Sequence, residues 1–165
     1  MDDPLGVRRS ERETLEGFLD WYRSVVERKV DGLMLDDATR PMTPTGMSAL
    51  GVVKHLGWVE RGWFRETFAG EDVEAIDVDG DNSADFAISR GDTIESVLDF
   101  YRNEVEESRR IFGTAPSLDT LSAKETLYRE HVSLRWIMVH MLEETARHAG
   151  HLDLMREEID GQVGD

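Results

Sequence analysis

Residues 133–161, SLRWIMVHMLEETARHAGHLDLMREEIDG, constrain the fold most strongly, because their apolar side chains repeat at helix spacing over the longest distance in the chain. At roughly 100° per residue, one face of this predicted helix collects Ile137, Met141, Glu144, His148, Leu152 and Met155. A carboxylate and an imidazole therefore lie within an apolar stripe. A bound cation would offset the cost of burying that charge.

Two further histidines flank this pair on its more polar side. His140, Glu144, His148 and His151 span an arc of roughly 80° on an ideal helix. Glu144 and His148 are one turn apart, so both side chains can reach a single ion. The helix thus predicts a set of potential metal ligands that point the same way.

Composition excludes several classes of function. With 35 acidic and 19 basic residues the formal net charge is −16, which disfavours nucleic acid or an anionic membrane as a partner. The absence of cysteine leaves only nitrogen and oxygen ligands for any metal. No apolar run resembles a signal peptide or a membrane span, so we expect a cytoplasmic protein, with residues 1–165 forming a single domain.

Three other segments carry helical periodicity, at about residues 11–34, 48–70 and 92–113. Ser48 is a suitable N-cap for the second, and Asp92 with Glu95 resembles a capping box for the third. The connections at residues 35–47 and 114–132 are expected to cross the ends of the fold, and residues 70–92 to form a long acidic surface loop.

His55 is the candidate that links the second helix to the last one. Val52, His55, Leu56 and Val59 share a face, which puts His55 on the core side. A lone histidine there is usually a satisfied core residue, so its importance depends on Glu144 and His148. Gly51 and Gly57, poor helix formers by roughly 1 kcal/mol each, indicate close approach of a neighbouring element or ligand.

Four amphipathic helices are most simply satisfied by an all-α four-helix bundle, in which metal sites form between facing helices. His55, Glu144 and His148 would hold one divalent ion with open coordination positions; zinc is the default, with nickel, iron and manganese as alternatives. The competing interpretation is that both histidines are core residues and that Glu144 pairs with an arginine such as Arg147.

Other site patterns fit less well. The chain lacks the paired Glu-x-x-His motifs of a di-iron bundle, the HExxH motif and a GxSxG nucleophile elbow. The acidic run at residues 77–88 begins like a calcium loop, but Asn82 and Ile88 stand where that loop needs Gly and Glu.

The segments TPTGMSALGVVKHLGWVERGWF and HMLEETARHAGHLDLMREEIDG resemble the DinB-like superfamily, particularly its branch of mycothiol-dependent enzymes. The resemblance implies an up-up-down-down four-helix bundle, commonly a homodimer, with one divalent metal on His55, Glu144 and His148. Many relatives have a third histidine where Glu144 stands. His151 would be a fourth ligand, a neighbour of the ligands or a proton carrier.

The resemblance also implies thiol chemistry, in which the metal lowers the pKa of the cosubstrate thiol for transfer or isomerisation. Mycothiol is preferred to bacillithiol, and the electrophile and the residues that bind the thiol are left open. The alternatives are a metal-dependent hydrolase that activates water and a non-catalytic helical bundle.

Overall fold

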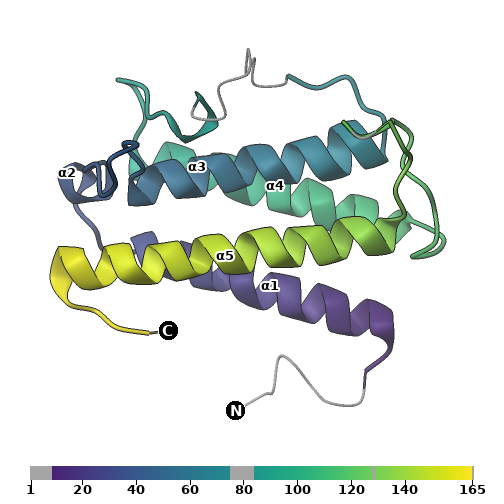
Figure 1. The fold of residues 1–165 in the computed structure, drawn as a ribbon, viewed down its shortest axis with the longest axis horizontal. Coiled ribbons are helices and arrows are strands. Elements are labelled where there is room, and N and C mark those ends of the chain that lie inside the picture. The colour runs from purple at the N-terminus through teal and green to yellow at the C-terminus, as the bar shows by residue number, and fades with distance from the viewer. Residues whose placement is uncertain (1–8, 75–83, 128, 165) are drawn as a thin grey trace.

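The computed structural model describes residues 9–74, 84–127 and 129–164 (Figure 1). The helical elements in chain order are α1 (Glu11–Val30), α2 (Leu35–Ala38), α3 (Ala49–Glu60), the π-helix η1 (Arg61–Phe68), the 3₁₀ turn η2 (Ala84–Phe86), α4 (Ile94–Thr114) and α5 (Leu134–Asp160). No strand occurs among these residues apart from an isolated bridge between Leu121 and Ser133. The predicted all-α class is confirmed.

Side-chain caps set where the long helices begin. Ser10 starts α1 with a full capping box, Ser48 caps α3 and Ser133 caps α5. At α4 the predicted cap is wrong by one residue: Thr93 and Ser96 form the capping box. Asp92 instead pairs with Lys54 on α3, at 2.7 Å between Oδ2 and Nζ.

One helix boundary and the type of one helix also differ from those predicted. The first helix ends at Val30 rather than residue 34, because Gly32 takes a left-handed conformation with φ of 73° that turns the chain out of the helix. The second helical segment spans the expected length, but its last part, η1, is a π-helix, in which the backbone amide of Ala69 donates to the carbonyl of Phe64.

Ion pairs along the bundle fix the relative directions of the helices. Glu11–Arg135 and Lys29–Asp153 join α1 to α5, and Asp20–Arg109 and Glu27–Arg102 join α1 to α4. Lys54–Asp92 joins α3 to the residue before α4, and Arg61–Glu104 joins η1, which continues α3, to α4. Helices α1 and α5 are therefore parallel, and α3 and α4 run the opposite way (Figure 1). The order is up-down-down-up, which corrects the expected up-up-down-down order. Helix α4 starts at the same end of the bundle as α3, whereas η1 ends at the opposite end.

The core divides into two apolar clusters along the bundle. One contains Val26, Leu50, Tyr101 and Leu152, and the other contains Leu19, Phe64, Ile111 and Met141, each with further neighbours. Along α5, the first cluster resumes at Ala149 and the second ends at Met141. The residues between them include Glu144 and His148, so the polar interruption seen in the sequence lies where the two clusters meet.

Candidate functional site

Helices α3 and α5 carry the three predicted ligand residues to one place. His55 on α3 is 8% exposed and His148 on α5 is 5% exposed. Fully burying an apolar side chain stabilises a fold by about 1.5–3 kcal/mol, so two imidazoles at such positions forgo part of that stabilisation. The contacts of the two imidazoles must account for this cost.

One carboxylate oxygen lies between the two rings. Oε1 of Glu144 is 3.2 Å from Nε2 of His55 and 3.2 Å from Nε2 of His148. The potential ligand atoms of these three residues all lie within 4.8 Å of one another. Among the described residues this is the group of His, Asp and Glu side chains with the spacing of a metal site.

Asp85, a residue that the sequence did not single out, contacts the ring nitrogen of His55 that faces away from Glu144. Nδ1 of His55 lies 2.6 Å from Oδ2 of Asp85, and Phe86 stacks on the imidazole with 4.0 Å between ring centroids and 10° between planes. Both residues belong to η2, in the long acidic loop. Nothing in the local pattern distinguishes Asp85 from the other aspartates of that loop, because its partner lies 30 positions earlier.

Asp85 determines which nitrogen of His55 is available. A neutral imidazole has one N–H, and a proton on Nδ1 donated to Asp85 leaves a lone pair on Nε2. In this tautomer the lone pair faces the Glu144 carboxylate across 3.2 Å, so two acceptors oppose each other, and a cation bound between them would remove the conflict. The carboxylate–imidazole arrangement is the one that orients histidine ligands in metal sites, and the residues present therefore fit a divalent ion.

The two oxygens of the Glu144 carboxylate have different partners: Oε1 faces the two histidines, and Oε2 faces Arg147. Oε2 accepts a hydrogen bond from Nη1 of Arg147 at 3.2 Å, and Arg147 also pairs with Glu143. The pairing with Arg147 considered in the competing interpretation is thus present, together with the contacts to both imidazoles. The adjacent imidazoles of His148 and then His55 hold the pKa of Glu144 well below its usual range, which keeps it anionic.

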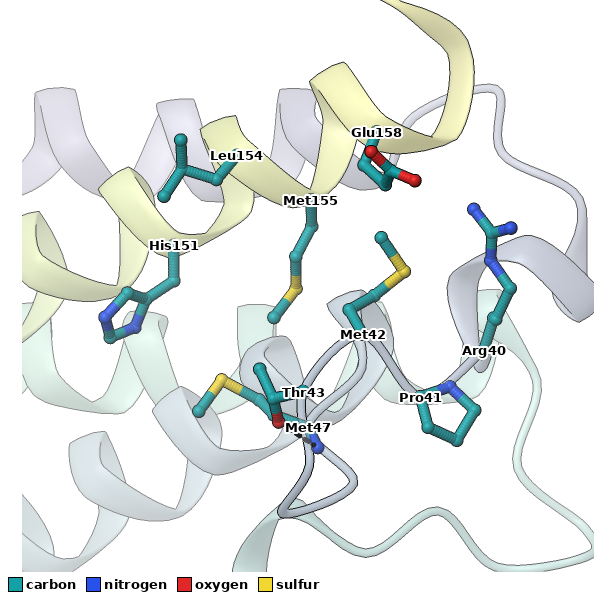
Figure 2. Close-up of a pocket in the computed structure, with 9 residues that line it drawn as sticks. All are labelled: Arg40, Pro41, Met42, Thr43, Met47, His151, Leu154, Met155 and Glu158. Carbon is teal, nitrogen blue, oxygen red and sulfur yellow. Dashed lines mark hydrogen bonds between the residues drawn. The ribbon is translucent and has the colours of Figure 1, made fainter.

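His151 adjoins the three residues without joining them. Its Nδ1 lies 3.4 Å from Nδ1 of His148, and its ring meets the His148 ring edge-on. Burial, and secondarily the proximity of His148, lower the pKa of His151, so its imidazole is neutral at neutral pH. His151 also lines a cavity beside the C-terminal half of α5 (Figure 2).

His140 does not meet the others, although the helical pattern put it on the same side. Its ring stacks on Trp136, with 5.2 Å between centroids, and meets the edge of Trp63 at 4.6 Å. The wider turn of η1 carries Trp63, so this aromatic group belongs to the junction of η1 and α5. His131 lies in the connection before α5, with Nδ1 2.7 Å from the carbonyl oxygen of Ser122.

The calcium-like run is described only in part. Its residues 77–83 lie outside the described residues, whereas Asp85 and Phe86 serve the His55 site. No helix among the described residues is long and apolar enough to cross a membrane.

Comparison with curated proteins gives no match. The sequence does match a protein family described as mycothiol S-transferase, over residues 14–161. This match covers nearly the whole chain, including α1, both helices of the site and the Asp85 loop. It agrees with the resemblance to mycothiol-dependent DinB-like proteins found in the sequence. The chain therefore belongs to the mycothiol S-transferase family.

Proposed function

We propose that the protein is a metal-dependent transferase that joins the sulfur of mycothiol to a small electrophile. The observation that carries the metal dependence is the convergence of two imidazole nitrogens on one carboxylate oxygen, with Asp85 directing the lone pair of His55 inward. Membership of the family supports mycothiol as the thiol and transfer as the reaction.

The ion would be held by His55, Glu144 and His148. Two nitrogens and one oxygen suit zinc, with nickel as the next candidate, and three protein ligands leave a coordination position open. Bound there, the cation would stabilise a thiolate and so keep the sulfur nucleophilic at neutral pH.

The chain's own residues supply orientation and proton transfer. Asp85 and Phe86 fix the plane and tautomer of His55. We assign His151 the role of general base: it is neutral, lies beside His148 and borders a cavity. It would accept the proton of the S–H group as the thiol enters.

The test measures metal content and thiol dependence together. Protein purified without added metal should retain close to one divalent ion per chain, and removing it should abolish conjugation of a generic electrophile with mycothiol. Apo protein should also melt at a lower temperature, because the ion binds only the folded state. Bacillithiol, glutathione and no thiol serve as comparison reactions.

Variants on α5 separate the roles. His148→Ala should lose the ion, whereas His140→Ala, two turns earlier on the same helix, should keep it. His151→Ala should keep the ion and slow turnover by about 10²–10⁴-fold. Equal rates with and without every thiol would leave a hydrolase or a non-catalytic bundle as the better account, and a wild type that retains no ion would overturn the site.

A cytoplasmic homodimer is part of the proposal. Trp58, Trp63 and Phe64 give the second helical segment more aromatic surface than one core-facing stripe needs, which makes this group a candidate dimer surface. Phe64 is 1% exposed within this chain, so Trp58 and Trp63, both half-buried, remain as candidates for that surface. Light scattering at working concentration tests the dimer, and a monomer alone would remove it.

A further inference from the structure

A cavity of about 550 Å³ lies between the C-terminal half of α5 and the connection at residues 40–47 (Figure 2). Its lining residues are Arg40, Pro41, Met42, Thr43, Met47, His151, Leu154, Met155 and Glu158. Its volume is in the range of pockets that enclose small molecules. His151 stands at one end, so the cavity adjoins the proposed thiol site.

The middle of the cavity is apolar and adaptable. Figure 2 shows the thioether side chains of Met42 and Met47, from the connection, and of Met155, from α5, lying between His151 and Arg40. Methionine side chains are flexible and polarizable, and they accommodate apolar ligands of varied shape. A wall of this kind offers few hydrogen-bond partners, so it suits the body of an apolar molecule rather than a hydrophilic thiol.

The end opposite His151 carries charge. Arg40 and Glu158 both lie there (Figure 2), and Arg40 is the one cationic residue of the lining. Within the described part of the chain, the Arg40 guanidinium has neither an ion pair nor a hydrogen bond, unlike Arg12, Arg23, Arg61, Arg65, Arg102, Arg109, Arg110, Arg135, Arg147 and Arg156.

The charge balance of the chain decides which of the two end groups is informative. With 35 acidic residues against 19 basic ones, unpaired carboxylates such as Glu158 are expected in any case. Among the described arginines without a carboxylate partner, Arg40 is the one that lines this cavity. Its planar guanidinium presents paired N–H donors that match a carboxylate, and it stays protonated at any physiological pH.

We infer that this cavity binds the electrophile, and that the electrophile is an apolar molecule with one carboxylate. The carboxylate lies against Arg40 and the apolar body against the methionines, which brings the remaining end towards His151. The role as electrophile site rests on the proposed function; the ligand class rests on the cavity alone.

The ligand class is tested by binding, without turnover. Methyl-¹³C methionine labelling allows the methyl signals of Met42 and Met47 to be followed by NMR as hexanoate or hexanamide is added. Met42→Leu and Met47→Leu assign the two signals. Hexanoate should shift both signals saturably, and its dissociation constant should be at least about tenfold lower than that of hexanamide, a difference of about 1.4 kcal/mol.

Charge variants provide opposite expectations. Arg40→Gln should weaken hexanoate at least tenfold and leave hexanamide unchanged, whereas Glu158→Gln should strengthen hexanoate by removing a like charge. Arg102→Gln, on α4, which contributes no residue to the lining, is the matched control and should change neither. Equal affinities for acid and amide, or an unchanged affinity for hexanoate in Arg40→Gln, would overturn the ligand class.

Inhibition assigns the cavity to one substrate. In turnover with mycothiol and 1-bromohexane, hexanoate should raise the KM for the bromide and leave the KM for mycothiol unchanged. A rise in the mycothiol KM alone would make the cavity the thiol site and overturn the inference. If hexanoate binds as expected but no thiol-dependent turnover exists, the proposed function fails while the ligand class stands.

Discussion

At the residue scale, His55 is the side chain whose surroundings decide the chemistry. On one side its Nδ1 meets Asp85, and on the other its Nε2 faces Glu144. Oδ1 of Asp85 is buried and has no hydrogen-bond partner in the described part of the chain. The Asp85 carboxylate is thus kept in a buried position with one oxygen committed to His55, an arrangement whose cost indicates a role beyond packing.

Asp85→Asn tests that role. The amide can still fill the space, but it no longer stabilises the Nδ1–H tautomer through a charged acceptor. Metal affinity should fall by about 10–100-fold while the helical content is unchanged. Competition with a chromophoric chelator measures the affinity, and Asp99→Asn, at an exposed position of α4, is the control. Equal affinities in both variants would contradict the role of Asp85.

At the element scale, the position of η2 depends on a missing side chain in α3. A Cβ added at Gly51 would lie 2.5 Å from the carbonyl oxygen of Phe86, a backbone atom that cannot turn aside. The close approach expected for this glycine is confirmed, and it brings Asp85 and Phe86 to His55. Gly57 similarly faces the Phe100 ring, at 2.6 Å from the position of an added Cβ.

Gly51→Ala should therefore push η2 away from α3 and lower metal affinity, although alanine is the better helix former. Gly150→Ala is the matched control: Gly150 lies within α5 with nothing near an added Cβ, so this substitution should stabilise the protein by up to about 1 kcal/mol. Thermal unfolding and chelator competition report the two effects. Equal gains in stability for the two variants would show that η2 does not require the glycine.

A second link between elements is the ion pair of Arg23 on α1 with Glu60 at the end of α3. Both side chains are almost fully buried, and Nη2 of Arg23 is 2.7 Å from Oε2 of Glu60. Burial alone would lower the pKa of Arg23, but Glu60 outweighs this effect and raises it above its usual value. Arg23 therefore stays protonated, and its contact with Glu60 is a fixed connection between the two helices.

Removing one partner should be more harmful than removing both. Glu60→Gln leaves the buried Arg23 guanidinium with only the partly exposed Asp20 as a counter-charge, at 2.9 Å, and should cost up to about 3–5 kcal/mol. The double variant Arg23→Met with Glu60→Met should be much less destabilised. Urea unfolding of the metal-free proteins compares them. A double variant less stable than the single one would mean that the pair contributes net stability.

At the scale of the whole molecule, acid has two opposite effects on stability: it weakens the ion pairs, and it reduces the repulsion among the surplus carboxylates. The Arg65 hydrogen bond lowers the pKa of Glu71, and the Arg135 hydrogen bond lowers that of Glu11. For Asp92, burial raises the pKa, but hydrogen bonds from Lys54 and the Ser89 amide outweigh burial, so the net pKa is lowered. Protonating the unpaired carboxylates, by contrast, relieves repulsion at a net charge of −16.

Because these paired carboxyls have lower pKa values in the folded state, their contribution is present above the ordinary carboxyl pKa of about 4 and is lost as the pH falls below it. In about 0.3 M salt, which screens the surface repulsion, the free energy of unfolding should fall between pH 5 and pH 3. Urea titrations with a chelator present exclude metal release as the cause. Glu71→Gln should lose less on acidification, and a protein more stable at pH 3 would contradict the expectation.

The sequence by itself determined the class of the fold and the faces of the helices, because helical periodicity is a local property of consecutive residues. It thus predicted the helical segment of α4 and the inward positions of His55 and His148. The metal-binding role of His55, Glu144 and His148 stays a prediction. Their proximity required the packing of α3 against α5, which local periodicity does not specify.

Only the tertiary structure decided how the loops complete the site. Asp85 reaches His55 because η2 packs against α3 at the place where Gly51 leaves room for it, and no periodic pattern encodes that contact. His140, which the helical wheel grouped with the ligands, is drawn to Trp63 and Trp136 by the packing of η1. Periodicity assigns a side chain to a face, whereas its contacts depend on which distant segment covers that face.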